Sequence, residues 1–141
     1  MSQSFEKRSI TAEGAQAVIS ACVAKAADGG GAFVIVVVDE SGVVKASLRM
    51  DGAPLLSVQV ATDKAYTAAG FGMATDAWFD FVDGDGPLRL GAPTGIDRLV
   101  VFGGGFPLAD GGQIVGAVGV SGGHWSDDME VAKAGVEAFG G

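Results

Sequence analysis

The sequence contains one cysteine, one histidine and only nine basic residues among its 141. A single cysteine, Cys22, cannot form an internal disulfide or a cysteine-based zinc site. Because a second nitrogen or sulfur ligand is missing at useful spacing, we predict no metal site. Cys22 falls on the apolar face of a predicted helix, where we expect a buried core thiol.

Long apolar runs are also missing, although 48% of the residues are hydrophobic and the mean hydropathy is +0.37. The longest run extends from Ala32 to Val38, before Asp39 and Glu40 interrupt it. A membrane-spanning helix needs about 20 apolar residues, so we expect no membrane segment. Residues 2–8 are polar and no signal-peptide core follows them, which favours a cytoplasmic location.

Positive charge is scarce, because 17 acidic residues outweigh the nine basic ones and give a formal net charge of −8. The Lys and Arg residues are scattered singly, whereas nucleic-acid-binding proteins cluster them against phosphates. We therefore predict no nucleic-acid partner. The length, with no repeat and no linker, indicates one domain over residues 1–141.

What the chain does have is glycine, at 24 positions, mostly between segments with a regular hydrophobic period. Thr11 is predicted to cap a first helix, which the glycines at 29–31 end. The β-branched run Phe33–Val38 predicts a central strand covered on both faces. Residues 39–42 predict a turn, and Val43–Met50 its antiparallel partner strand.

A second helix is predicted to begin near Pro54 and to end at Gly70 and Gly72. Thr75 is expected to cap a short helix that carries Trp78, Phe79 and Phe81. The face that the second helix buries is predicted to consist mainly of small residues: Leu56, Val60, Ala61, Ala65, Ala68 and Ala69.

The rest of the chain is predicted to alternate loops and strands before a last helix. Glycine and proline in residues 84–95 predict a loop, and Leu99–Phe102 predicts a strand. Residues 103–112 are expected to form a long turn and Ile114–Val120 another strand. Ser126 is expected to cap the last helix, whose buried face is Met129, Ala132, Val136 and Phe139.

This order of elements indicates an α/β (α+β) fold in a single domain. Because hairpins dominate, the central sheet of about four to five strands is expected to be mostly antiparallel, with helices packed on it.

Five segments together resemble the motifs of the GlcG/HbpS-like family, in the same order and spacing. They are RMDGAP at 49–54, DKAYTA at 63–68, GGGFPL at 103–108, IVGAVGVSGG at 114–123, and Asp128 with Ala132, Ala134 and Gly135. The resemblance implies a compact α/β domain that forms homo-oligomers. It implies a varied function, since relatives include haem-binding sensors, a domain attached to cobalamin adenosyltransferases and proteins encoded beside catabolic genes.

His124 is the candidate for acid–base chemistry, because histidine titrates near neutral pH and this one lies between two glycines and Trp125. The alternative is a loop histidine that bonds only backbone groups. Arg49 and Lys64 are candidates for steadying an anionic group, and an arginine can hold a carboxylate with two parallel hydrogen bonds. On a helix Lys64 and Tyr66 point about 200° apart, so they are not expected to share a pocket.

The literal pattern G-x-S-x-G at residues 119–123 is not expected to be a hydrolase elbow, because Gly122, Gly123, His124 and Trp125 separate Ser121 from the next helix. An apolar ligand pocket is instead indicated by an aromatic group, about half of which is expected to be core or oligomer interface: Trp78, Phe79, Phe81, Phe102, Phe106 and Trp125. Its expected lining residues are Tyr66, Phe71, Phe102, Gly122, Gly123 and Trp125.

The leading hypothesis is a small-molecule-binding protein that holds haem or a catabolic metabolite in an oligomeric pocket. The alternative is a cofactor-independent lyase, isomerase or hydratase, in which His124 is the general acid or base and Arg49 or Lys64 steadies the developing anion.

Overall fold

The computed structural model, which describes residues 1–140, contains one four-stranded antiparallel sheet with the strand order β2-β1-β4-β3. The predicted fold class is therefore confirmed. The strands are β1 (Val34–Asp39), β2 (Val44–Arg49), β3 (Gly105–Asp110) and β4 (Gln113–Ser121). The helices are α1 (Ala12–Gly29), α2 (Ser57–Phe71), α3 (Thr75–Asp83), α4 (Gly86–Gly95) and α5 (Trp125–Ala138).

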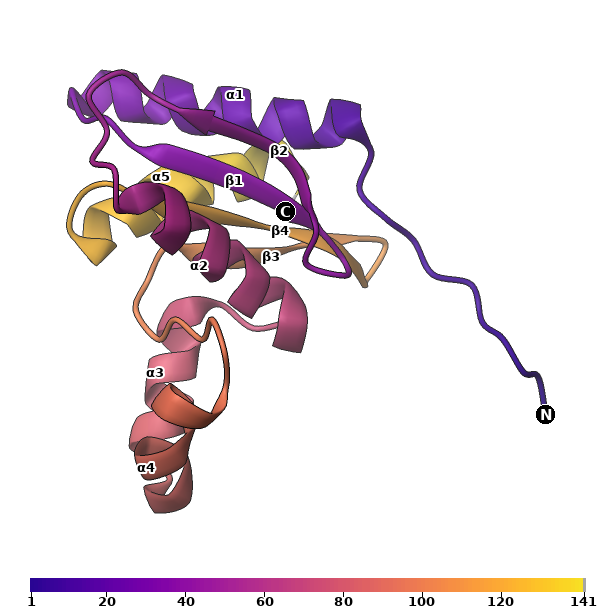
Figure 1. The fold of residues 1–141 in the computed structure, drawn as a ribbon. Helices are drawn as coiled ribbons and strands as arrows, with labels where there is room; N and C mark the ends of the chain where they lie inside the picture. Colours follow the sequence, from indigo (N-terminus) through magenta and orange to yellow (C-terminus); the bar gives the residue numbers. More distant parts are fainter. Residues whose placement is uncertain (141) are drawn as a thin grey trace.

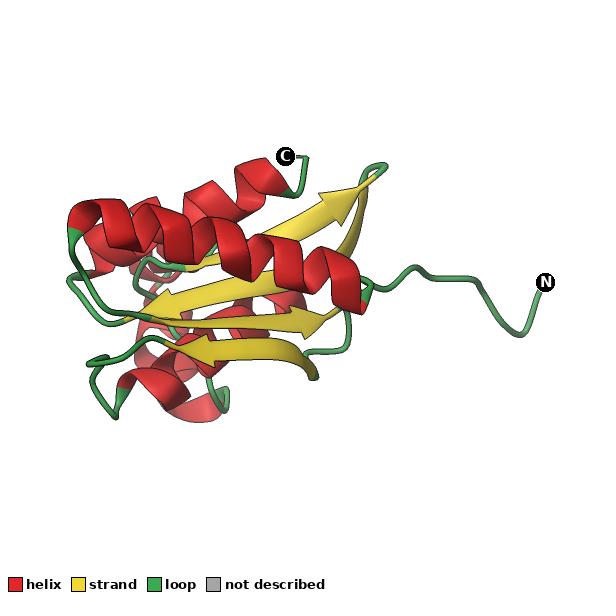
Figure 2. Ribbon diagram, turned by 90° about the horizontal axis from the view of Figure 1, so that it is seen from above, coloured by secondary structure: helices red, strands yellow, loops and turns green. Residues whose placement is uncertain are grey.

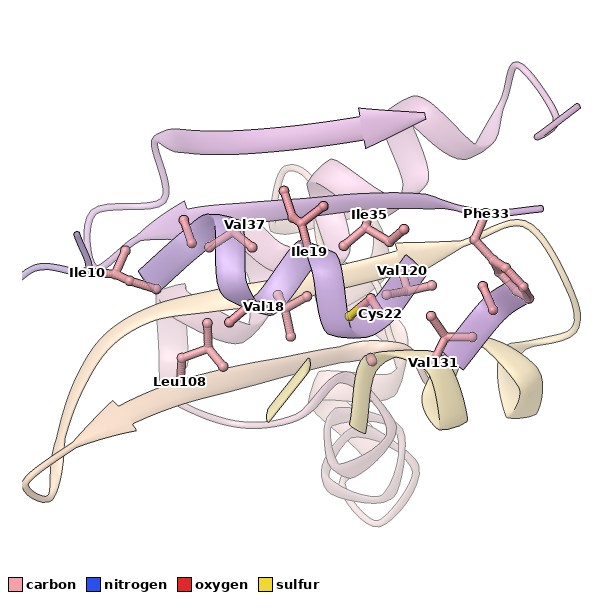
Figure 3. Packing of buried hydrophobic residues seen from close by; sticks show 14 of the residues in the cluster. Ile10, Val18, Ile19, Cys22, Phe33, Ile35, Val37, Leu108, Val120 and Val131 are labelled. Carbon is pink, nitrogen blue, oxygen red and sulfur yellow. The ribbon is translucent and has the colours of Figure 1, made fainter. Parts of the chain in front are cut away.

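Helices cover both faces of the sheet, and Figure 1 shows α1 and α2 on opposite sides of it. On one face α1 and α5 pack on Ile35 and Val37 of β1 and on Val120 of β4 (Figure 3). On the other face α2 packs on Val34 and Val36 of β1. The alternation along β1 explains its continuous apolar run, since both sets of side chains are buried.

The small-residue face of α2 lets the helix approach β4 unusually closely. Ala61, Ala65 and Ala68 are fully buried there, and Gly119 of β4 lies beneath them. Leu56 was wrongly predicted on this face, because it precedes the first helical residue and is exposed. A Cβ atom on Gly119 would overlap the Ala61 carbonyl oxygen and lie 2.6 Å from the Ala65 nitrogen. Small side chains on both elements therefore determine the spacing between this helix and the sheet.

α3 and α4 extend from one side of the sheet as a separate helical pair (Figure 1). The prediction of a loop over residues 84–95 was wrong, because Asp85 caps α4 by accepting from the Leu88 nitrogen and Pro87 occupies its first turn. Both are helix-start signals, and Pro93 lies near the end of the helix.

Two further predictions in the middle of the chain were wrong. Leu99–Phe102 forms no strand, because the segment packs on the α3–α4 pair and its Val100 nitrogen bonds to Thr67 instead of a neighbouring strand. Residues 103–112 are mostly strand β3, and only the turn at Gly111 and Gly112, both with positive φ, joins it to β4.

The two predicted helix caps at Thr75 and Ser126 were also wrong. Ala74 precedes α3, while the Thr75 hydroxyl accepts from the Gly105 nitrogen. His124 is the N-cap of α5, two residues before the serine, which lies inside the first turn. The cap of α1 at Thr11 and the buried thiol of Cys22 are confirmed.

The segment before α1 leaves the body of the molecule, as Figure 2 shows from above. Arg8 holds its base through a 2.6 Å ion pair with Asp110, and Ile10 is buried. No helix in residues 1–140 is long and apolar enough to cross a membrane.

Candidate functional site

A pocket of about 460 Å³ opens between α3, the segment that follows α4, and the first turns of α5. Three aromatic rings, each about half-exposed, and one thioether line it: Phe79, Phe102, Trp125 and Met129. A concave, mainly apolar site with few polar groups is the usual form of a small-molecule site. We take this aromatic pocket as the candidate functional site.

The polar groups of the aromatic pocket are acidic. Asp76 and Asp80 line it, and its lining within residues 1–140 includes no Lys or Arg. The Oδ1 atom of Asp76 is buried and has no hydrogen-bond partner in that part of the chain. A buried carboxylate oxygen without a hydrogen-bond donor is costly, so Asp76 adds an unsatisfied acidic group to this wall of the pocket.

The backbone at Gly103 forms part of the same lining. A Cβ atom there would overlap the Met129 sulfur and lie 2.6 Å from its Cγ. Glycine is therefore required for Met129 to lie against this segment, which keeps the thioether in the pocket wall.

Behind the pocket lies a buried ion pair. The Nζ atom of Lys64, a residue with no exposed surface, lies 2.8 Å from the Asp128 carboxylate and 2.9 Å from the Val120 carbonyl oxygen. Asp128 also accepts from the Gly123 nitrogen at 3.0 Å. Burial lowers the pKa of the Lys64 amine and raises the pKa of the Asp128 carboxyl, while their pairing opposes both changes.

His124 lies beside the pocket, with its ring 4.9 Å from that of Trp125. Its Nδ1 atom lies within hydrogen-bond distance of the Ser126 nitrogen and 2.8 Å from the Ser126 hydroxyl. The Ser126 hydroxyl accepts from a protonated Nδ1 atom and donates to a deprotonated one, so these two contacts do not select a tautomer of the neutral ring. The arrangement places an imidazole ring against Trp125, one of the aromatic residues of the pocket.

The structure distributes the predicted lining residues over three pockets. Phe102 and Trp125 line the aromatic pocket. Tyr66 and Phe71 line a second one of about 650 Å³, with Trp78, beside the segment after α4. Gly122 and Gly123 line a third, of about 350 Å³, between α1 and α5.

The candidate anion-binding residues do not come together. Arg49 lies exposed on the edge strand β2 and lines none of the three pockets, while Lys64 is buried in its ion pair. Lys64 and Tyr66 do point in different directions, because the Tyr66 ring packs under the Arg98 guanidinium at 3.8 Å. Asp63 pairs with Arg98 at 2.8 Å, which joins α2 to the segment after α4.

Three residues of the site were missed by the sequence reasoning: Asp76, Asp128 and Met129. Phe79 belonged to the aromatic group expected in a pocket, and it lines this one. Asp128 carried a signal, since it belongs to a quoted family motif, but its position in the first turn of a helix favoured a dipole role. The position of Asp76 depends on where α3 packs, which helical spacing alone does not reveal.

Comparison with known proteins places the chain in a family. Residues 10–137 match the family model described as haem degrading protein HbpS-like. An uncharacterised 15.0 kDa protein of Citrobacter freundii, from the dhaT-dhaS intergenic region, is 34% identical over 139 residues, which cover 99% of this chain and 98% of that protein.

Solved structures agree with this match. Klebsiella pneumoniae protein ORFY superposes with a TM-score of 0.93 at 32% identity, covering 99% of this chain and 97% of that one. A PduOC:haem complex superposes with a TM-score of 0.84 at 30% identity, covering 92% of this chain and 94% of that one.

Proposed function

This chain belongs to the haem degrading protein HbpS-like family, and we propose that it binds haem in the aromatic pocket. One observation carries the proposal: Phe79, Phe102, Trp125 and Met129 surround a cavity of about 460 Å³ while remaining partly exposed. The haem complex of a relative with the same fold supports the choice of ligand.

The residues of the pocket fit the macrocycle and the iron. Three aromatic rings offer faces for a flat apolar ligand. Met129 supplies a thioether sulfur, a known axial ligand of haem iron, and His124 supplies a ring nitrogen at the edge. When bound, haem would supply redox or gas-binding chemistry, while these residues hold it and exclude water.

The charge of the pocket does not complement the propionates, because Asp76 and Asp80 are both acidic. We therefore expect the propionates to face away from α3. Exposed Asp80 is the residue to neutralise, and Asp80→Asn is expected to strengthen haem binding a few-fold at low salt, with the gain shrinking as salt screens the repulsion.

Titration of the purified chain with haem, followed by the Soret absorption, tests the binding site. Phe79→Ala removes one ring, and the loss of about 2 kcal/mol of apolar contact weakens binding about 30-fold. Phe81→Ala is the matched control, since Phe81 lies on the same helix with 47% exposure against 52% for Phe79 but outside this pocket. Equal affinities of the two variants would place haem elsewhere.

The axial ligand is identified by the wavelength of the Soret band. Met129 lines the aromatic pocket, whereas His124 lies beside it and its Nδ1 atom takes part in the cap of α5. We therefore expect Met129→Leu to shift the band and His124→Ala to leave it in place. The opposite pattern would make His124 the ligand.

We also infer that the chain forms a homo-oligomer. Leu55, Leu56 and Val58, close together in the chain at the start of α2, are all exposed, and large contiguous apolar patches on a protein surface commonly mark interaction sites. Native mass spectrometry is expected to give a multiple of the 14.1 kDa chain mass. A single-chain mass at micromolar concentration would contradict this.

The enzyme alternative stays a prediction, with His124 as acid or base and Arg49 or Lys64 beside it. His124→Ala should then abolish turnover while ligand affinity is kept. A catabolic role, a cytoplasmic location and the lack of a nucleic-acid partner likewise stay predictions.

A further inference from the structure

Lys64 contacts two of the three elements that form the aromatic pocket, although it lines none of it. Its Nζ atom lies 5.1 Å from the centroid of the Phe102 ring. A cation over an aromatic face is attracted by the ring, and more strongly where water is excluded. The buried ammonium group therefore stabilises the position of the Phe102 ring, which is one wall of the pocket.

On the other side, the same ammonium holds α5. The Asp128 carboxylate of α5 accepts a hydrogen bond from the Lys64 Nζ atom at 2.8 Å. Asp128 lies one turn from Trp125 and next to Met129, the two pocket residues of this helix. Asp128 also accepts from the Gly123 nitrogen, which ties the loop before α5 to the same carboxylate. The ion pair thus joins the Phe102 wall to the Trp125–Met129 wall.

Glycines 104 and 105 complete the connection. A Cβ atom on Gly104 would lie 2.7 Å from both the Lys64 Nζ atom and the Val120 carbonyl oxygen, so the chain passes directly over the ion pair. The Gly105 nitrogen donates to the buried Thr75 hydroxyl at 3.0 Å. Thr75 precedes Asp76, so the third wall, α3, is tied to the same segment.

We propose that the Lys64–Asp128 ion pair is a positioning device for the aromatic pocket, one that sets the spacing of its walls for a ligand. The proposal rests on the proposed ligand-binding function of that pocket. A pair with only a role in folding would lower stability when removed but leave the affinity of the folded protein unchanged.

The test is a double variant, Lys64→Met with Asp128→Asn, because removing Lys64 alone leaves a buried unpaired carboxylate and is expected to unfold the chain. Replacing both charges with neutral groups of similar size often preserves stability, and the asparagine oxygen still accepts from Gly123. We expect the folded double variant to bind haem about tenfold more weakly, which corresponds to about 1.4 kcal/mol.

The matched control is the surface pair Arg8–Asp110, whose side chains are 54% exposed each. The corresponding double variant, Arg8→Met with Asp110→Asn, is expected to leave haem affinity unchanged. A Lys64–Asp128 double variant that binds haem within twofold of the original chain would overturn the proposal.

A readout without ligand separates this proposal from the haem proposal. In a Trp78→Phe background, Trp125 is the remaining tryptophan. Its quenching by acrylamide measures how accessible the indole ring is, and therefore whether α5 has moved relative to its neighbours. We expect quenching to increase in the Lys64–Asp128 double variant and to stay at the level of the original chain in the Arg8–Asp110 control. If haem does not bind but quenching rises, the positioning role stands and the haem proposal fails; if haem binds and quenching is unchanged, the positioning role fails.

Discussion

Gly119 lies where α2 crosses β4, and a single methyl group at this position tests how that contact is built. In Gly119→Ala the added Cβ would overlap the Ala61 carbonyl oxygen and lie 2.6 Å from the Ala65 nitrogen. Both atoms belong to the helix backbone, so no side-chain rotation relieves the overlap. The helix has to move away from the sheet, which opens the cluster around Val36.

The expected cost follows from measured overpacking of protein cores, which is typically about 1–3 kcal/mol. Because backbone atoms cannot give way, we expect a loss of about 3 kcal/mol. This is a large part of the free energy of unfolding of such domains, which is about 5–15 kcal/mol. With a slope of about 2 kcal/mol per molar urea, the unfolding midpoint falls by about 1.5 M. Circular dichroism during urea titration measures it.

Gly70→Ala is the matched control, since Gly70 lies in α2 with no atom within 4 Å of its added Cβ. Alanine favours helix over glycine, so this variant should be about 0.5 kcal/mol more stable. A Gly119→Ala midpoint equal to that of the original chain would refute the close contact between α2 and β4.

Three other predictions concern buried groups. Burial raises the pKa of the Cys22 thiol to about 12, so native Cys22 should not react with a thiol reagent at pH 8 and should react once urea unfolds the chain. Because the pKa of the folded thiol exceeds the unfolded value of 9.0, this group does not change the free energy of unfolding below pH 9. As the pH rises toward 12, the free energy of unfolding falls by about 4 kcal/mol, which lowers the urea midpoint. Val36→Asp places a charge in a strand covered on both faces and should abolish soluble expression; a soluble, cooperatively folded variant would disprove the strand placement. Thr67→Val removes the hydroxyl that donates to the Arg98 oxygen and accepts from the Val100 nitrogen, and should cost about 1–3 kcal/mol in urea unfolding.

The parts of the fold that could be predicted are helices with a long regular spacing of apolar residues and strands buried on both faces. Phe33–Val38 and Ile114–Val120 were recognisable because every side chain in their central part is buried. The segment after Gly84 was not, because glycine and proline content outweighed the Asp85 cap. β3 was missed because its glycine and proline are tolerated by an edge strand.

The candidate site could be predicted only in part, for a physical reason. Phe102 and Trp125 were expected near one another, and both line the aromatic pocket. The Lys64–Asp128 pair joins residues 64 positions apart, and nothing local in either helix shows that both point to the same place. The family motifs contained both residues, but the motifs alone do not show which side chains pair.

The most direct test of the central claim is native mass spectrometry of the purified chain after incubation with haem, with an absorption spectrum of the same sample. The account predicts a complex whose mass exceeds the oligomer mass by one haem per aromatic pocket, together with a Soret band that weakens in Phe79→Ala. An oligomer that takes up no haem and shows no Soret band would contradict it.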